Sequence, residues 1–146
     1  MVIAQKAINR NPANPVLSAK DWPYEVHSVF NPGVTRVGND VVLLVRCENH
    51  VGVSHLCVAR SENGVDGWRI DKSPTLVPEP DKYKEELWGI EDPRITYLEE
   101  EKKWIIAYTS FSSNGPLVSL AETRDFKKFK RCGAILLPEN KDAALL

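Results

Sequence analysis

This 146-residue sequence has almost no excess of charge of either sign, because 19 Lys and Arg residues are balanced by 20 Asp and Glu residues. A formal net charge of −1 creates no field that would attract nucleic acid or an anionic membrane. The sequence also lacks an apolar stretch near the roughly 18 residues of a membrane span, and residues 1–11 lack the apolar core of a secretion signal. We therefore expect a cytoplasmic protein with neither a nucleic-acid partner nor a membrane partner.

Paired cysteines and metal-binding spacings are missing as well. The three cysteines, Cys47, Cys57 and Cys132, are an odd number and sit in apolar runs, which favours buried free thiols over a disulfide framework or a zinc site. The three histidines lack a metal-ligand spacing, and the sequence has no nucleophile elbow or phosphate loop. It therefore predicts no metal and no cofactor. The basic run at 127–131 is typical of a solvated turn rather than of a nucleic-acid patch.

Short strand signals separated by turns dominate what is present. Ten prolines and eight glycines disfavour long helices, and no window shows sustained helical periodicity. Turn sequences such as Asn63-Gly64 and Asp66-Gly67 interrupt the apolar runs. The sequence thus predicts an all-β fold. Its clearest strand signals cover 41–45, 54–59, 104–108, 117–121 and 135–137.

An internal repeat with an offset of 61 to 62 residues organises these strands. Each repeat supplies about four short strands, which favours a propeller blade over a duplicated β-meander in a sandwich. Trp68 and Phe129 occupy matching positions, so we expect them to pack between neighbouring blades. The aligned pairs are Asn31-Pro32 with Asp92-Pro93, 42–45 with 104–107, and 59–63 with 121–125.

The repeat also sets the expected domain organisation. An N-terminal segment at 1–27 precedes blade-like repeats at about 28–89 and 90–146, and 143–146 resemble the opening strand of a third unit. Because a closed propeller needs about four to eight blades, this chain does not close a ring. We therefore expect a truncated chain, and its exposed blade edges favour self-association as a homo-oligomer.

Asp92 is the strongest candidate for chemistry. Asn31 and Asp92 both begin a repeat beside a proline, so the symmetry aims both side chains at the common axis. Desolvation in a channel lined by Trp88 would raise the pKa of Asp92 and suit it to proton donation. The alternative is an Asp-Pro turn whose neighbours make surface ion pairs. In an extended chain the adjacent Glu91 carboxylate is expected on the opposite side, which argues against a cooperating pair.

Arg46 is a second candidate, because it ends the apolar strand at 43–45 and should be partly buried. A buried arginine needs a partner. Glu48 or an aspartate could supply it, or the guanidinium could present its N–H groups to a ligand oxygen. The residues alone leave these alternatives open.

Seven segments carry a specific combination of residues in a fixed order from about residue 11 to the end. They are Phe30–Val34, Leu43–Glu48, Ala59–Gly64, Gly89–Thr96, Asn114–Pro116, Thr123–Phe126 and Pro138–Ala143. Together they resemble glycoside hydrolase family 130, the β-mannoside phosphorylases and related β-mannosidases. The resemblance implies an all-β, five-bladed β-propeller, of which this chain is the N-terminal portion, with about two blades plus the start of a third.

The resemblance also implies an activity and a set of site residues. In that family inorganic phosphate attacks a β-mannoside with inversion and releases α-mannose 1-phosphate. Asp92 matches the general acid, Asn31, Arg46 and Asp142 match positions that hold the mannose, and Lys141 matches a basic position near the phosphate. The implied partners are a mannose-containing oligosaccharide and phosphate, which is a co-substrate, with no cofactor.

Two other functions stay open. A non-catalytic carbohydrate-binding or assembly module is one, because the family's remaining phosphate-binding side chains come from later blades. A β-mannosidase of the same family is the other, and it would need a base to activate water. Lys141 favours phosphorolysis over hydrolysis, because phosphate brings its own nucleophilic oxygen and needs mainly cationic positioning.

Overall fold

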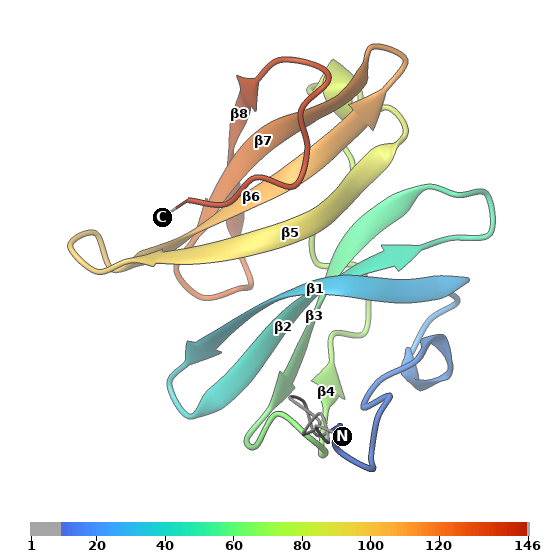
Figure 1. Cartoon of the computed structure of the whole chain (residues 1–146), viewed down its shortest axis with the longest axis vertical. Coiled ribbons are helices and arrows are strands. Elements are labelled where there is room, and N and C mark those ends of the chain that lie inside the picture. Colours follow the sequence, from blue (N-terminus) through green and yellow to red (C-terminus); the bar gives the residue numbers. More distant parts are fainter. Residues whose placement is uncertain (1–9, 146) are drawn as a thin grey trace, which may run out of the picture.

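The computed structural model describes residues 10–145 and consists mainly of antiparallel β-strands (Figure 1). The all-β prediction is confirmed, and the strand expected at 135–137 in fact begins at Phe129. The strands of the first unit are β1 (Ser28–Val37), β2 (Asp40–Glu48), β3 (Ser54–Ser61) and β4 (Arg69–Ile70). Those of the second unit are β5 (Gly89–Leu98), β6 (Lys103–Ser112), β7 (Gly115–Thr123) and β8 (Phe129–Leu136).

Helical structure within residues 10–145 is limited to two short 3₁₀ turns. They are η1 (Ala19–Asp21), ahead of the first unit, and η2 (Lys84–Glu86), in the connection between the units. None of the described helices is long and apolar enough to cross a membrane.

The repeat seen in the sequence is present in the backbone. The first strands of the two units, β1 and β5, are each ten residues long. Each has a register shift at the equivalent place, between Phe30 and Gly33 in β1 and between Glu91 and Arg94 in β5. Within each shift one non-glycine residue adopts a positive φ, 47° at Asn31 and 49° at Asp92. The β-bulge therefore recurs at both candidate site positions.

The two units meet where β3 of the first touches β5 of the second. Ser54 and Gly89 form the parallel pairing that joins them. Gly89 has a φ of 122°, and a Cβ at this residue would lie 2.8 Å from the Ser54 nitrogen. A Cβ on Gly33 would likewise lie 2.9 Å from the Pro93 carbonyl oxygen. Both glycines are needed because backbone from one unit approaches the other too closely for a side chain.

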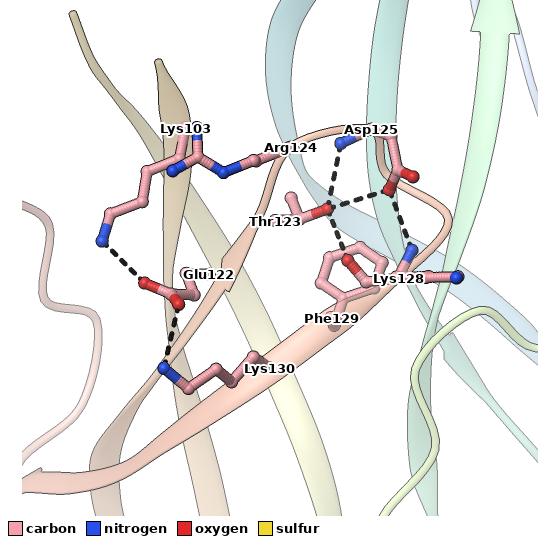
Figure 2. A pocket seen from close by; sticks show the side chains of 8 residues that line it. All are labelled: Lys103, Glu122, Thr123, Arg124, Asp125, Lys128, Phe129 and Lys130. Carbon is pink, nitrogen blue, oxygen red and sulfur yellow. Dashed lines mark hydrogen bonds and ion pairs between the residues drawn. The ribbon is translucent and has the colours of Figure 1, made fainter. Parts of the chain in front are cut away.

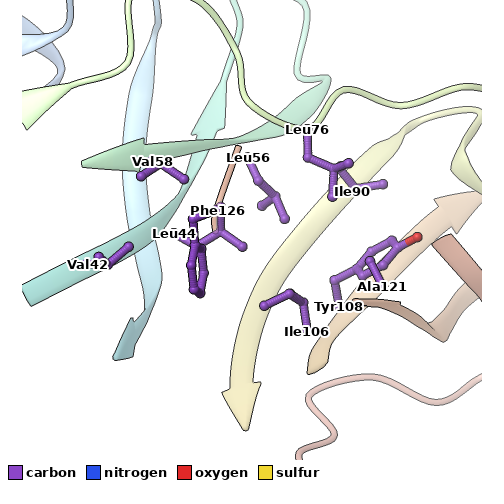
Figure 3. Close-up of a cluster of buried hydrophobic side chains, with 10 residues drawn as sticks. All are labelled: Val42, Leu44, Leu56, Val58, Leu76, Ile90, Ile106, Tyr108, Ala121 and Phe126. Carbon is purple, nitrogen blue, oxygen red and sulfur yellow. The ribbon is translucent and has the colours of Figure 1, made fainter. Parts of the chain in front are cut away.

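A hydrophobic cluster with members from both units fills the space between them (Figure 3). Phe126, in the β7–β8 loop, is fully buried in this cluster, and its carbonyl oxygen accepts a hydrogen bond of 3.1 Å from Arg60. Phe129 packs against the cluster, whereas Trp68 belongs to no part of it and lines a hollow beside the N-terminal segment. The buried members are Val42, Leu44, Leu56, Val58, Leu76, Ile90, Ile106, Tyr108, Ala121 and Phe126.

A second cluster lies on the first unit, where Trp22 and Val26 of the N-terminal segment pack against β2 and β3. Cys47 and Cys57 belong to it, and both are buried free thiols as predicted. Cys132 is exposed, so the prediction that all three thiols are buried is wrong for this one. Its position in β8 follows the strand alternation, since Arg131 on the other side is the side chain that turns inward.

After β8 the chain crosses back over the second unit (Figure 1). Its end is fixed where the Thr96 hydroxyl donates to the Leu145 carbonyl oxygen at 3.0 Å. Residues 143–145 form no strand, so the expected opening of a third unit is absent from this described part of the chain.

Candidate functional site

Asp92 is held at the start of β5 by the bulge. Its side chain is 7% exposed, and its Oδ1 atom accepts two hydrogen bonds. One comes from Asn31 Nδ2 at 3.0 Å and the other from an Arg46 terminal nitrogen at 3.1 Å. No hydrogen bond to Oδ2 occurs among residues 10–145, so this oxygen is available for an external group. The two bulged strands thus bring both predicted axis residues into direct contact.

Arg46 lies at the centre of the site, with its side chain 12% exposed and its guanidinium 4.4 Å from the centre of the Phe30 ring. Its partners are Ser54 Oγ at 2.9 Å, Asp92 Oδ1 at 3.1 Å, Glu91 Oε1 at 3.0 Å and Glu48 Oε2 at 3.4 Å. These four hydrogen bonds leave only one guanidinium N–H free. Of the alternatives that the sequence left open, carboxylate pairing is therefore the one observed.

Glu91 and Asp92 face the same guanidinium, which corrects the expectation that they point to opposite sides. Strict alternation applies to a regular strand, whereas here the positive φ of Asp92 breaks it. The two adjacent carboxylates and Glu48 consequently share one positive charge.

The pKa values of the two adjacent carboxyl groups move in opposite directions. Burial acts to raise the pKa of Asp92, but the hydrogen bonds from Asn31 and Arg46 outweigh burial, and the pKa lies below its usual value. The raised pKa expected from the sequence is therefore wrong for this chain. For Glu91, burial dominates over the attraction of Arg46, and its pKa is raised. The pair thus separates into a readily ionised Asp92 and a more proton-retaining Glu91.

Lys141 and Asp142, the remaining predicted site residues, lie in the exposed segment after β8. The positive charge of Lys141 acts to lower the pKa of both Glu91 and Asp92, although burial outweighs it at Glu91, so Lys141 lies in their electrostatic neighbourhood. Neither residue makes a hydrogen bond or an ion pair with Asn31, Arg46 or Asp92 within the described structure. The fold therefore brings three of the five predicted residues into direct contact, and the other two do not join that contact.

Sequence reasoning named Glu48 and an aspartate as possible partners of Arg46, and both pairings are observed. It missed the involvement of Glu91 and Ser54. One signal was available for Ser54, because the hairpin pairing of β2 with β3 puts it directly opposite Glu48. Tyr108 matches Arg46 in the repeat but does not join this site, since its hydroxyl instead donates to Glu86 at 2.9 Å.

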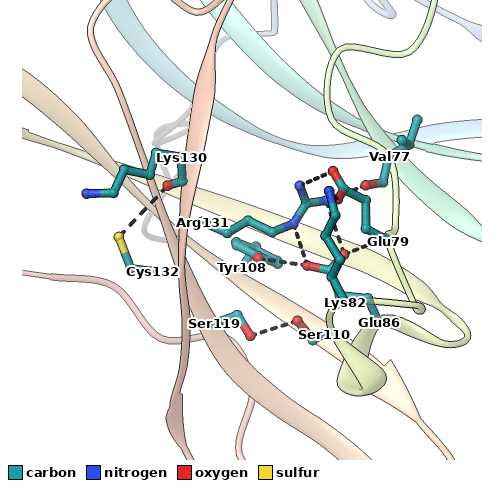
Figure 4. A network of polar contacts seen from close by, with 10 residues as sticks. All are labelled: Val77, Glu79, Lys82, Glu86, Tyr108, Ser110, Ser119, Lys130, Arg131 and Cys132. Carbon is teal, nitrogen blue, oxygen red and sulfur yellow. Dashed lines mark hydrogen bonds and ion pairs between the residues drawn. The ribbon is translucent and has the colours of Figure 1, made fainter.

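Tyr108 belongs to a separate buried ionic network (Figure 4). Arg131, at the end of the predicted basic run, is 6% exposed and pairs with Glu86, of which 1% is exposed, at 2.8 Å. It also pairs with Glu79 at 2.9 Å and donates to the Val77 carbonyl oxygen. The network ties the connection between the units to β8, so the basic run is not solvated throughout as predicted.

A hollow of about 340 Å³ lies where β7 ends and β8 begins, beside the loop that joins them (Figure 2). Its ammonium groups on Lys103 and Lys130 are already paired with the Glu122 carboxylate, at 2.7 and 3.2 Å. The hollow shares no residue with the Asp92 site. Its lining residues are Lys103, Glu122, Thr123, Arg124, Asp125, Lys128, Phe129 and Lys130.

No group of three or more His, Cys, Asp or Glu side chains suited to a metal ion occurs in residues 10–145. The carboxyl groups of Asp92 and Glu91 and the guanidinium of Arg46 can perform proton transfer and hydrogen bonding.

The family model described as beta-1,4-mannooligosaccharide phosphorylase matches residues 5–144. The chain belongs to glycoside hydrolase family 130. A β-1,2-mannobiose phosphorylase of Thermoanaerobacter sp. (strain X514) is 35% identical to this family 130 chain, over 90% of the chain and 47% of that protein. A β-1,4-mannooligosaccharide phosphorylase of Ruminococcus albus is 27% identical over 91% of the chain and 37% of that protein.

Solved structures of family 130 proteins share this fold. The complex of a Listeria innocua β-1,2-mannobiose phosphorylase with β-1,2-mannobiose superposes with a TM-score of 0.81 at 22% identity, over 91% of this chain and 52% of that one. A second structure, from work reporting glycoside hydrolases within the family that target β-1,2-mannosidic linkages, has a TM-score of 0.75 at 27% identity, over 86% of this chain and 40% of that one. This family 130 chain spans less than half the length of the curated relatives that it matches.

Proposed function

We propose that this chain forms part of an inverting glycoside phosphorylase that cleaves β-mannosides with inorganic phosphate and releases α-mannose 1-phosphate. The two four-stranded units are then two blades of a five-bladed β-propeller. The observation that carries the proposal is the convergence of Asn31 and Asp92, at the matched bulges of β1 and β5, with Arg46 of β2, in a chain whose relatives are mannoside phosphorylases.

In this mechanism a phosphate oxygen attacks the anomeric carbon, the glycosidic C–O bond breaks, and a proton from Asp92 passes to the leaving oxygen. Oδ1 is anchored by two donors, so Oδ2 is the atom that delivers the proton. Because phosphate is itself the nucleophile, no second carboxylate is needed to activate water. The protein supplies one acid and the positioning of both substrates.

The free chain holds Asp92 with a pKa below its usual value, so Asp92 is ionised near neutrality. Proton donation therefore requires that the bound mannoside takes over one of the two donors on Oδ1. Loss of a hydrogen bond to the ionised form raises the pKa of a carboxyl group. Mannose hydroxyls are the natural competitors for the N–H groups of Asn31 and Arg46 that are donated to Oδ1.

The remaining predicted residues have roles in binding. Lys141 attracts the phosphate dianion from its exposed position beside the carboxylates, and Asp142 accepts hydrogen bonds from mannose hydroxyls. Phosphate is a co-substrate, and the reaction uses no cofactor.

Two alternatives are each favoured by one observation. The lowered pKa of Asp92 disfavours its service as a proton donor, which favours a non-catalytic carbohydrate-binding or assembly module. One of the similar solved structures comes from work that reports glycoside hydrolases within the family, which favours a β-mannosidase.

Incubation of the protein with β-1,2- or β-1,4-mannobiose, with and without phosphate, separates the three functions. Phosphate-dependent formation of mannose 1-phosphate supports the phosphorylase, and its loss in Asp92→Asn with retained sugar binding supports the acid assignment. Free mannose formed without phosphate identifies a hydrolase. Sugar binding without any product identifies a binding module and refutes the proposal for this chain.

A further inference from the structure

Glu91 is part of the site but has no role in the mechanism described so far. Its carboxylate lies 3.0 Å from the Arg46 nitrogen that also contacts Glu48, while the other terminal nitrogen contacts Asp92. Three carboxylates therefore surround one guanidinium. The charged groups that face the pair are Arg46 and Glu48 of β2 and Lys141 of the C-terminal segment.

An excess of negative charge in a partly buried site favours the retention of a proton by one carboxyl group. Asp92 is the least suited to retain it, because two donors stabilise its ionised form. Glu48 is the most exposed of the three, at 24%, so water stabilises its charge. Glu91 has one donor and is only 14% exposed. Donor number and burial therefore assign the retained proton to Glu91, and the upward shift of its pKa agrees.

We propose that Glu91 holds the proton that Asp92 delivers, and that Arg46 keeps the two carboxyl groups together for its transfer. This inference rests on the proposed function, since it supplies the proton that an ionised Asp92 lacks. Glu91 is thus a positioning residue that acts through Asp92 and does not itself touch the substrate.

The proton balance closes without any further reactant. When a mannoside takes a donor away from Oδ1, the Glu91 carboxyl gives its proton to the Asp92 carboxylate. Asp92 then passes that proton to the leaving oxygen as the glycosidic bond breaks. The hydrogen phosphate dianion loses one proton as it becomes the sugar phosphate dianion, and this proton returns through solvent to Glu91, part of whose side chain is in contact with solvent.

Carbon-13 NMR titration of the side-chain carboxyl groups in this chain tests the charge assignment. We expect Glu91 to titrate at a higher pH than Asp92. In Asp92→Asn the titration midpoint of Glu91 should fall, because its charged neighbour is gone. In Glu91→Gln, which keeps volume and an acceptor for Arg46, the high-pH step should disappear while Asp92 titrates as before. Glu48→Gln is the matched control, and in it the Glu91 step should remain the highest of the site.

A Glu91 midpoint at or below that of Asp92 overturns the inference, as does a Glu91 midpoint that stays unchanged in Asp92→Asn. These results are independent of turnover. Retained phosphorolysis by Asp92→Asn would refute the proposed function while the titration could still assign the proton to Glu91. In the active protein, Glu91→Gln should reduce kcat and leave KM unchanged, whereas a purely structural role would not spare KM.

Discussion

Removing the positive charge of Arg131 should cost this chain a large part of its stability. The Arg131 side chain is 6% exposed, and its guanidinium donates to both oxygens of Glu86 at 2.8 and 3.1 Å (Figure 4). In Arg131→Met the Glu86 carboxylate stays buried with only the Tyr108 hydroxyl and the Glu79 backbone N–H as donors. Breaking one side of a buried ion pair typically costs about 3–5 kcal/mol, because the other charge is left uncompensated.

Urea and thermal unfolding followed by circular dichroism measure this loss. For a chain of this size each kcal/mol lowers the midpoint temperature by about 2–4 °C, so Arg131→Met should unfold about 6–20 °C earlier than the wild type. Lys130→Met is the matched control on the neighbouring residue of the same strand. The Lys130 side chain is 79% exposed and pairs with Glu122 at 3.2 Å, so its removal should leave the midpoint nearly unchanged.

The double variant Glu86→Leu/Arg131→Met separates the cost of an unpaired charge from the value of the pair itself. With both charges replaced by apolar side chains, most of the loss seen in Arg131→Met should be recovered. If Arg131→Met is as mild as Lys130→Met, the network is not the buried link between the connection and β8 that its geometry indicates.

Three other perturbations have defined outcomes. Gly89→Ala should lower the free energy of unfolding in urea by about 1–3 kcal/mol from its φ of 122° alone, and by more because of the clash with Ser54. Gly38→Ala is the control for positive φ without a clash, because a Cβ added at Gly38 would have no contacting atom within 4 Å. The pKa of Asp92 is lowered in the fold, so its charge stabilises the protein above the unfolded pKa, and this stabilisation is lost as pH falls through the folded pKa. The stability difference between wild type and Asp92→Asn should therefore shrink in acid, and a constant difference would contradict the shift. Lys141→Ala should raise the phosphate concentration required for half-maximal phosphorolysis, and an unchanged requirement would remove Lys141 from the phosphate site.

The strands and their repeat could be predicted because they depend on local signals. Turn residues, β-branched runs and a 61-residue offset are visible without knowledge of tertiary contacts. The same offset predicted that Asn31 and Asp92 lie at equivalent places, and they are in fact hydrogen-bonded to each other. A symmetric repeat thus carries information about contacts between residues far apart in the chain.

The errors arose where the backbone departs from regular geometry or where long-range pairs decide burial. A bulge at Asp92 puts Glu91 on the same guanidinium, which the alternation of a flat strand does not anticipate. Asp92 was expected to be desolvated and proton-retaining, but two donors from other strands reverse that balance. Arg131 looked like one more solvated cation because its partner Glu86 lies 45 residues away.

Ser54 links the Arg46 site to the junction between the two units. Its backbone forms the junction of the two units, and its hydroxyl accepts the hydrogen bond from Arg46 Nε at 2.9 Å. A tilt of one unit against the other would therefore move the Arg46 guanidinium relative to Asp92. The position of the Asp92 carboxylate relative to Arg46 is in this way tied to the angle between the units, and a ligand that fixes that position also fixes the angle.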